Sequence, residues 1–360
     1  MRALVLAALL VATPAIAQPR LSLIKACETP KGIEFQGGGY GGISGIDHDP
    51  RTGLWAFISD DKSERGPSHF FLGRLDVRPD KPCGPTQEAM VPLRREDGAT
   101  FPDRKAGTEA ADGEAIRFDP LSHDLVWATE GDFEHSDPPS VRRIKADGTP
   151  VQRVVVPDAL TFHAGGATGA RKNATVEGLS WSVDGRFLWL SMEWPLVQDG
   201  PIPSVSETGL TRLTRLDRAG KARGQYAYRV DPVQVASPVG VNDNGISEIL
   251  ALDDHRLLVL ERSGVKQADG RYSYHIRLYL ADLAKAQDIS KIESLGVTPV
   301  RAVEKRLLLN FDRLGIRIDN LEAMAWGPRL EDGARTLVLA SDDNYDANQV
   351  NQILVLRFAP

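Results

Sequence analysis

The stretch TVEGLSWSVDGRFLWLSMEW (175–194) decides the fold. Two short runs of alternating apolar residues flank Asp184-Gly185, a dipeptide typical of tight turns, so the stretch is predicted to be a β-hairpin. Four other segments repeat its pattern of a small or acidic residue, an apolar strand, a turn, a second apolar strand and an acidic end. They are GGISGIDHDPRTGLWAFISDD (41–61), DGEAIRFDPLSHDLVWATEGD (112–132), GISEILALDDHRLLVLERSG (245–264) and NLEAMAWGPRLEDGARTLVLASDD (320–343).

The five hairpins recur at similar spacings and predict a ring of repeats. Their anchor positions are 70, 63, 71 and 74 residues apart, and are Ser44, Glu114, Glu177, Glu248 and Glu322. More strand-like sequence follows each hairpin, as in 211–230, which gives about four strands a unit, the content of a propeller blade. We therefore expect an all-β chain that forms a β-propeller of five four-stranded blades. The wide spacing of the repeats leaves two alternatives, long loops or a degenerate sixth blade, for which 284–319 is the favoured place.

The ends of the chain predict how the ring closes. The last strand, QILVLRF (352–358), leaves the fifth unit one strand short, and the early strand LSLIKA (21–26) has no unit of its own. Pairing between the N-terminal and C-terminal strands would complete the last blade and remove exposed sheet edges. Residues 18–360 are accordingly expected to form one domain.

The N-terminal segment is typical of an export signal. Residues 1–17 combine Arg2, an apolar run over 3–12 and the small-residue site Ala15-Ile16-Ala17. The run is too short to span a membrane. We expect an exported, periplasmic or secreted protein with no integral membrane segment. In such a compartment Cys27 and Cys83 would pair as a disulfide, the alternative being two separate buried thiols.

Composition narrows the class of function. The 360 residues include 49 Asp+Glu and 43 Lys+Arg, a formal net charge of -6, and 42% hydrophobic residues. The hydrophobic content supports a packed core, and the acidic balance without a long basic run argues against nucleic acid as a partner. The expected partner is a small molecule, and the expected state is a monomer.

The hairpin arithmetic places acidic residues at one end of every unit. Positions 177 and 193 are centred on the Asp184-Gly185 turn, so both glutamates lie at the open end of that hairpin. Propeller blades direct their first strands at the central channel, so these ends should meet at one mouth of it. The predicted metal-binding set is Glu114, Glu177, Glu248, Glu322, Asp60, Asp61, Glu130, Asp132, Glu193, Glu261, Asp342 and Asp343.

Crowded carboxylates repel one another unless cations neutralise them. Oxygen-only clusters suit hard divalent ions, so the predicted cofactor is a divalent cation, with calcium favoured. Catalysis is assigned to Glu177, Glu248, Arg262 and Lys62, and substrate binding to Arg65, Arg171, Lys172 and Asn244. Metal, guanidinium and carboxylate together suit hydrolysis of phosphoric esters. The alternatives are a metal-dependent lactonase or carboxylesterase, and a non-catalytic binding propeller that calcium stabilises.

The segments DGEAIRFDP (112–120), TVEGLSWS (175–182) and NLEAMAWGP (320–328) resemble the phytase-like family, described as "esterase-like activity of phytase", of exported bacterial proteins. The resemblance covers most of the chain after residue 17. It implies a β-propeller hydrolase with acidic site residues, which by matching motif are Glu114, Glu177, Glu248 and Glu322. The first repeat departs from the motif with Ser44, and the chain lacks the DADDPA-type signature of true β-propeller phytases.

Overall fold

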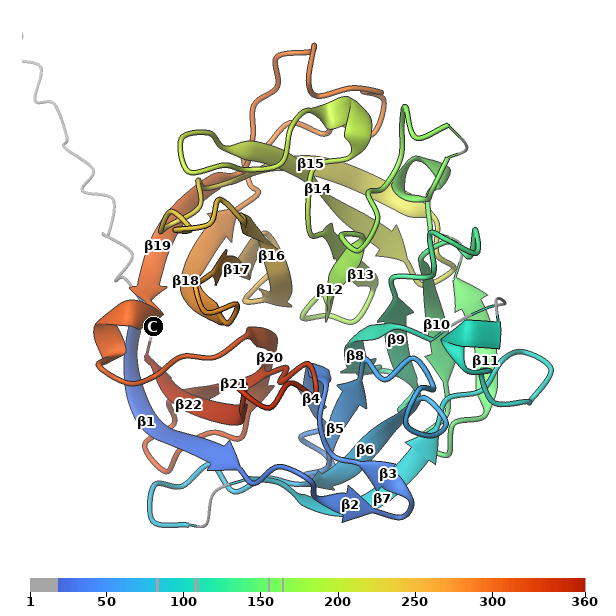
Figure 1. Cartoon of the computed structure of the whole chain (residues 1–360), viewed down its shortest axis with the longest axis vertical. Helices are drawn as coiled ribbons and strands as arrows, with labels where there is room; N and C mark the ends of the chain where they lie inside the picture. Colours follow the sequence, from blue (N-terminus) through green and yellow to red (C-terminus); the bar gives the residue numbers. More distant parts are fainter. Residues whose placement is uncertain are drawn as a thin grey trace, which may run out of the picture.

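The computed structural model describes residues 19–81, 84–106, 109, 111–154, 156–163 and 165–359. The predicted export signal (1–17) and Cys83, and with Cys83 the predicted disulfide, lie outside the described residues. The described chain is a β-propeller whose blades are arranged in a ring around a central axis (Figure 1).

Five four-stranded antiparallel sheets form the blades, as predicted. Blade 1 contains β4 (Ile43–His48), β5 (Trp55–Ser59), β6 (His69–Arg74) and β7 (Thr86–Pro92). Blade 2 contains β8 (Gly113–Phe118), β9 (Leu125–Thr129), β10 (Ser140–Ile144) and β11 (Pro150–Val154). Blade 3 contains β12 (Val176–Trp181), β13 (Phe187–Met192), β14 (Gly209–Asp217) and β15 (Ala222–Val230). Blade 4 contains β16 (Asn242–Ala251), β17 (Arg256–Lys266), β18 (Tyr272–Asp282) and β19 (Glu304–Asn310).

Blade 5 joins the two ends of the chain. Its strands are β20 (Leu321–Gly327), β21 (Arg335–Ser341), β22 (Asn351–Ala359) and β1 (Arg20–Thr29). β1 forms the outer edge by antiparallel pairing with β22, from Arg20 opposite Ala359 to Thr29 opposite Asn351. The predicted closure by the N-terminal and C-terminal strands is therefore confirmed, and the first and last strands lie side by side in Figure 1.

Of the two alternatives for residues 284–319, long loops or a degenerate sixth blade, the structure shows the first. Residues 284–319 provide β19, which is the outer strand of blade 4, together with loops and one short 3-10 helix. The remaining elements are small: the two-stranded ribbon of β2 (Glu34–Phe35) and β3 (Gly38–Gly39), and the 3-10 helices η1 (Arg104–Ala106), η2 (Asp158–Leu160), η3 (Val197–Asp199) and η4 (Phe311–Leu314).

The hydrophobic core is divided into layers between neighbouring blades. On β5, Trp55 and Phe57 pack toward blade 5, whereas Ala56 and Ile58 pack toward blade 2. Successive side chains of a strand point to opposite faces, and a blade buries both faces. This explains why the second strand of each hairpin is strongly apolar throughout.

The first strands of the five blades line the channel, and each contains a β-bulge. Strands β4, β8, β12, β16 and β20 contact the first strands of the neighbouring blades. The five bulges lie at equivalent places, at Ser44, Glu114, Glu177, Ser247 and Glu322. A bulge re-aims the side chain of its extra residue, and here four of the five bulge residues reach the channel mouth.

A buried ion pair crosses the middle of the channel. Arg117 of β8 pairs with Glu248 of β16, and both side chains are almost fully buried. The Arg117 guanidinium also donates to the backbone carbonyls of Leu179, at 2.6 Å, and of Ile46. This central ion pair thereby connects blades 1, 2, 3 and 4, and it lies between the two mouths.

Candidate functional site

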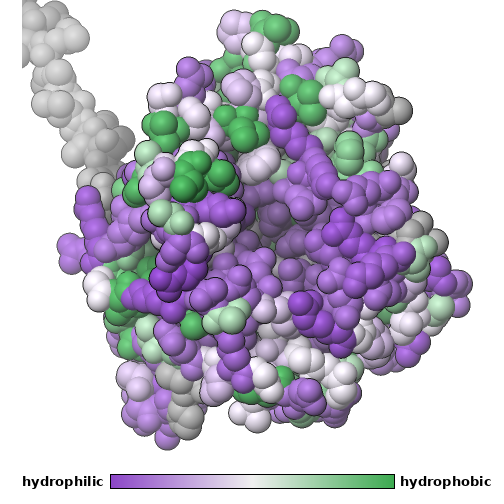
Figure 2. Space-filling model, viewed as in Figure 1, coloured by the Kyte–Doolittle hydropathy of each residue, from purple (hydrophilic) through white to green (hydrophobic). Residues whose placement is uncertain are grey.

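A hydrophilic pocket of about 520 Å³ opens at the mouth of the channel where the bulges lie. Figure 2 shows this face of the molecule, with hydrophilic side chains around a central hollow. We call it the acidic pocket, because it is lined by the carboxylates of Asp60, Glu114, Glu130, Glu177, Glu193, Asp243, Glu322, Asp342 and Asp346. Two cations, Lys62 and Arg262, line it with them.

Blades 1, 2, 3 and 5 each contribute two equivalent positions to the pocket. The first is the bulge residue, which is glutamate in blades 2, 3 and 5 and Ser44 in blade 1. The second position is the residue directly after the end of the second strand. It is Asp60, Glu130, Glu193 or Asp342 in those four blades. Of the twelve predicted metal-binding acids, the structure brings together Asp60, Glu114, Glu130, Glu177, Glu193, Glu322 and Asp342.

In blade 4 the predicted pair of acids is wrong by one residue. The bulge residue is Ser247, and Glu248 lies where the other blades have Gly45, Ala115, Gly178 and Ala323. On the second strand, Glu261 pairs with Ile246, so that Arg262 takes the place of an acid. Arg262 enters the pocket in this way and lies among its carboxylates.

Glu248 and Glu261 are held outside the pocket by other partners. Besides the Arg117 ion pair, Glu248 accepts hydrogen bonds from the backbone N–H groups of Leu179 (3.1 Å) and Ile249 (2.8 Å). Glu261 accepts a hydrogen bond from the Tyr228 hydroxyl (2.8 Å) and pairs with Lys305. Both glutamates therefore connect blades and do not face the acidic pocket.

Three other predicted acids organise loops. Asp61 accepts hydrogen bonds from the backbone N–H groups of Glu64 and Arg65, at 2.9 and 3.2 Å. Asp132 binds the Arg104 guanidinium at 2.9 Å. Asp343 accepts a hydrogen bond from the backbone N–H of Gly42 at 2.9 Å and so links blade 5 to blade 1.

Of the four predicted substrate-binding residues, one lies beside the acidic pocket and three lie away from it. Arg65 is exposed, stacks over the Tyr345 ring at 4.1 Å, and lines a side pocket of about 210 Å³ with Lys62 and Arg104. This side pocket adjoins the acidic pocket, because Asp60, Lys62 and Asn344 line both.

The other three predicted substrate-binding residues do not line the acidic pocket. Arg171 donates to two backbone carbonyls, Lys172 pairs with Glu134, and Asn244 donates to the backbone of Asp231.

Burial and mutual repulsion raise the pKa of the pocket carboxyls. Burial raises the pKa of Glu130 to about 7, and Asp112 adds to the rise, while a hydrogen bond from the Thr175 backbone opposes it. Burial, followed by repulsion from Glu193, also raises the pKa of Glu177. Conversely, although burial disfavours its charge, Lys62 has a raised pKa because Asp112 lies beside it. The pocket thus favours an additional positive charge.

One group of acids in blade 2 fits a hard cation. Asp112, Glu114 and Glu130 are all buried, and each offers one carboxylate oxygen within 4.8 Å of those of the other two. Asp112 pairs with Lys62 through Oδ2 at 2.6 Å, while its buried Oδ1 has no hydrogen-bond partner among the described residues. Buried oxygen atoms without partners are what an oxygen-coordinated ion such as Ca²⁺ or Mg²⁺ requires.

These features define a class of closed β-propellers with a carboxylate-lined pocket, and cations between the carboxylates, at one channel mouth. The family comparison agrees with this class. The family described as phytase-like, "esterase-like activity of phytase", matches residues 38–345, and the chain belongs to this family.

Other comparisons add little. No curated protein matches the chain. Among solved structures, a thermostable family-43 glycoside hydrolase is 11% identical with a TM-score of 0.47, covering 91% of this chain and 92% of its own. A putative glucose dehydrogenase from Thermus thermophilus is 15% identical, with a TM-score of 0.38 and coverage of 89% and 84%. A mannose phosphorylase from Leishmania mexicana is 12% identical, with a TM-score of 0.38 and coverage of 84% and 78%.

The described part of the chain contains no helix long and apolar enough to cross a membrane.

Proposed function

We propose that the protein is an exported, cation-dependent hydrolase of phosphoric esters, and that the acidic pocket is its active site. One observation carries the proposal: buried carboxylates and two cations converge on one pocket at the channel mouth. The family description supports hydrolysis, and the signal-like segment 1–17 supports export.

Asp112, Glu114 and Glu130 would hold the cation. When bound, a divalent cation polarises a phosphoryl oxygen and neutralises developing charge. Lys62 and Arg262 would bind the other phosphoryl oxygens. Arg262 is fixed for this by ion pairs with Glu193, at 2.7 Å, and with Glu322, at 3.4 Å. The surrounding carboxylates raise the pKa of both side chains above the ordinary values, so their charges persist at neutral pH.

The order of the blades places a base and an acid on opposite sides of the cation site in blade 2. Blade 2 lies between blade 3, which contributes Glu177, and blade 1, which contributes Asp60 and Lys62. Glu177 lines the pocket and makes no side-chain hydrogen bond or ion pair with any described residue, and the nearby Arg262 charge favours its ionised form, so we assign its carboxylate the role of general base. An in-line displacement needs this opposed arrangement of attacking and leaving oxygens.

In the proposed step, Glu177 removes a proton from water while the water oxygen bonds to phosphorus. The ester P–O bond breaks on the side of blade 1, and Asp60 donates a proton to the leaving oxygen. Burial and the neighbouring Asp112 raise the pKa of Asp60, which favours the protonated form that this role needs. The side pocket formed by Lys62, Arg65 and Arg104 would receive the leaving group.

A panel of esters tests the proposed function. The purified protein with about 1 mM calcium is expected to hydrolyse 4-nitrophenyl phosphate or bis(4-nitrophenyl) phosphate. A chelator should remove the activity, and added calcium should restore it. Turnover of 4-nitrophenyl acetate or a lactone alone would instead identify a carboxylesterase or lactonase. If no ester turns over while calcium still raises Tm, the propeller is a binding scaffold.

The raised carboxyl pKa values predict how stability depends on pH without a cation. The folded protein keeps protons on groups such as Glu130 up to about pH 7, whereas a glutamate of the unfolded chain loses its proton at about pH 4.3. The folded state therefore binds more protons in this window, and its stability falls as the pH rises from about 5 to 7.

We expect Tm of the chelator-treated protein to fall by on the order of 5 °C over that range. Calcium should raise Tm more at pH 7 than at pH 5, since protons and the cation compete for the same oxygens. Thermal unfolding followed by circular dichroism measures both effects. A Tm that rises with pH in the absence of calcium would contradict the prediction.

A further inference from the structure

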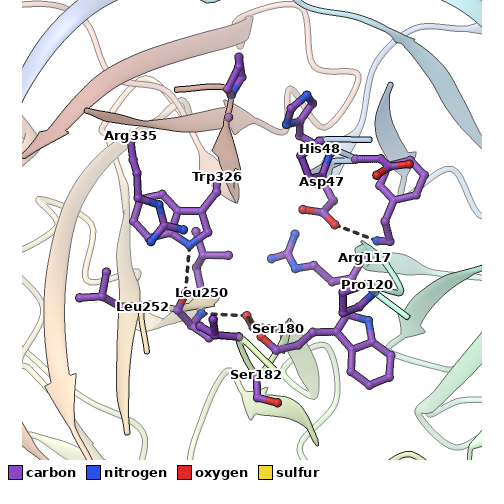
Figure 3. A pocket seen from close by; sticks show the side chains of 18 of the residues that line it. Asp47, His48, Arg117, Pro120, Ser180, Ser182, Leu250, Leu252, Trp326 and Arg335 are labelled. Carbon is purple, nitrogen blue, oxygen red and sulfur yellow. Dashed lines mark hydrogen bonds between the residues drawn. The ribbon is translucent and has the colours of Figure 1, made fainter. Parts of the chain in front are cut away.

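A second cavity, of about 620 Å³, opens at the other mouth of the channel. It is lined by the hairpin turns of all five blades, at the opposite ends of the strands that carry the bulge residues (Figure 3). Arg117 lies at its inner end, and the central ion pair with Glu248 lies between this cavity and the acidic pocket. We call it the turn-side cavity.

The turn-side cavity contains two guanidinium groups without an acidic partner among the described residues. Arg335 stacks over the Trp326 ring, with its guanidinium carbon 3.3 Å from the ring centre (Figure 3). It makes no side-chain hydrogen bond or ion pair with the described residues. Arg329 donates only to the backbone carbonyl of Gly333, at 2.8 Å, and also lacks an ion pair within the described chain. Burial and the charge of Arg329 lower the pKa of Arg335 to about 10.

The acids of this cavity do not neutralise those two arginines. Asp49 is paired with Arg51 at 2.8 Å. Asp47 accepts a hydrogen bond from the backbone N–H of Phe118 at 2.8 Å, and burial raises its pKa to about 6. The turn-side cavity therefore carries excess positive charge, although the chain as a whole has a net charge of -6.

Part of the cavity wall is apolar, and the Trp326 ring in it is held in place by its neighbours. Trp181, Leu250 and Leu252 line it together with Trp326. The Trp326 indole N–H donates to the carbonyl of Ala251 at 3.0 Å, and its ring packs edge-on against Phe358. Since Trp326 is held from both sides, the surface on which Arg335 stacks is formed before any ligand arrives.

We propose that the turn-side cavity binds a small organic anion that has a flat apolar body and one carboxylate group. The volume lies in the range of small-molecule pockets, about 300–1,000 Å³. A guanidinium fork matches the two oxygens of a carboxylate, and the apolar side chains of Leu250 and Leu252 can contact a flat apolar body. The central ion pair separates this site from the acidic pocket, so the ligand is not the substrate of the proposed hydrolysis. The site stands whether or not that hydrolysis is found.

Titration calorimetry of the whole protein with 2-naphthoate tests the proposal. One molecule is expected to bind with a dissociation constant below about 1 mM. The neutral analogue 2-naphthalenemethanol should bind at least about tenfold more weakly, since it lacks the charge that Arg335 recognises. Arg335→Gln should weaken naphthoate binding by about tenfold or more, and Arg313→Gln, at an exposed arginine of η4, should not change it.

A second variant guards against misfolding of Arg335→Gln. Leu252→Trp narrows the cavity from blade 4 and keeps the arginine at position 335, and it should also weaken binding. Thermal unfolding shows whether each variant is folded. The proposal is overturned if naphthoate does not saturate the protein below about 1 mM, if the alcohol binds as tightly, or if both folded variants bind naphthoate like the original protein.

Discussion

Replacing Glu177 with glutamine is expected to lower kcat for the hydrolysed ester by about 10²- to 10⁴-fold. Glutamine keeps the size of the side chain but cannot take a proton from water. Glu177 lies at a bulge, lines the acidic pocket, and has no hydrogen bond or ion pair to other described residues that the change would break. Steady-state kinetics with the best substrate of the ester panel measures the loss.

The matched control is Glu304→Gln, an exposed glutamate on the outer strand of blade 4. It should leave kcat unchanged. Calcium should still raise the Tm of Glu177→Gln, because the Asp112, Glu114 and Glu130 carboxylates remain. Full activity in the folded Glu177→Gln protein would remove Glu177 from the mechanism.

Replacing Arg117 with methionine is expected to lower the free energy of unfolding by about 3–5 kcal/mol. The change leaves the carboxylate of Glu248 buried without its ion pair, and leaves the carbonyls of Ile46 and Leu179 without their donor. Losing a partner of a buried charge costs more than the pair itself contributes. Urea unfolding, followed by tryptophan fluorescence, measures the shift in midpoint.

A double variant separates the charge from the packing. Arg117→Met combined with Glu248→Leu should be more stable than Arg117→Met alone, because the unpaired buried charge is removed. Arg313→Met, on the surface, should change the stability by less than about 0.5 kcal/mol. An unchanged midpoint in Arg117→Met would show that the central ion pair does not hold the blades.

A variant of Glu248 alone tests the catalytic role that the sequence suggested for this residue. If Glu248 only connects blades, Glu248→Gln should lose stability while the folded enzyme keeps its kcat. A catalytic Glu248 would lose kcat at full stability. The structure favours the first outcome, since Glu248 does not line the acidic pocket.

A repeated pattern of one strand, a turn and a second, strongly apolar strand was enough to predict the hairpins and the blade count, because the blades bury both faces of their second strands. The closure of the ring followed from counting strands. Positions within a strand were harder to predict, since a bulge adds one residue that alternation does not reveal. In blade 4 this displaced the predicted acids by one residue, from Ser247 to Glu248.

A signal for the correct alignment was present in the sequence. Gly42-Ile43-Ser44 of the first repeat recurs as Gly245-Ile246-Ser247 in the fourth. Aligning these tripeptides, with the hairpin still centred beside Asp254, places Arg262, and not Glu261, at the position equivalent to Asp60. The roles of Arg171 and Lys172 had no such signal, because a long cationic side chain in a loop binds whichever carbonyl or acid folding brings near it.

The pairing of β1 with β22 determines the order in which the molecule can fold. Blades 1 to 4 each use one continuous stretch of chain, but blade 5 needs Arg20 beside Ala359. Contacts between residues this far apart in the sequence form slowly, because closing so long a loop costs much conformational entropy. Until then β22 and the open side of blade 1 expose unpaired edges and apolar faces. The open ring is therefore the form most prone to aggregate, and β1 is the segment whose late arrival ends that risk.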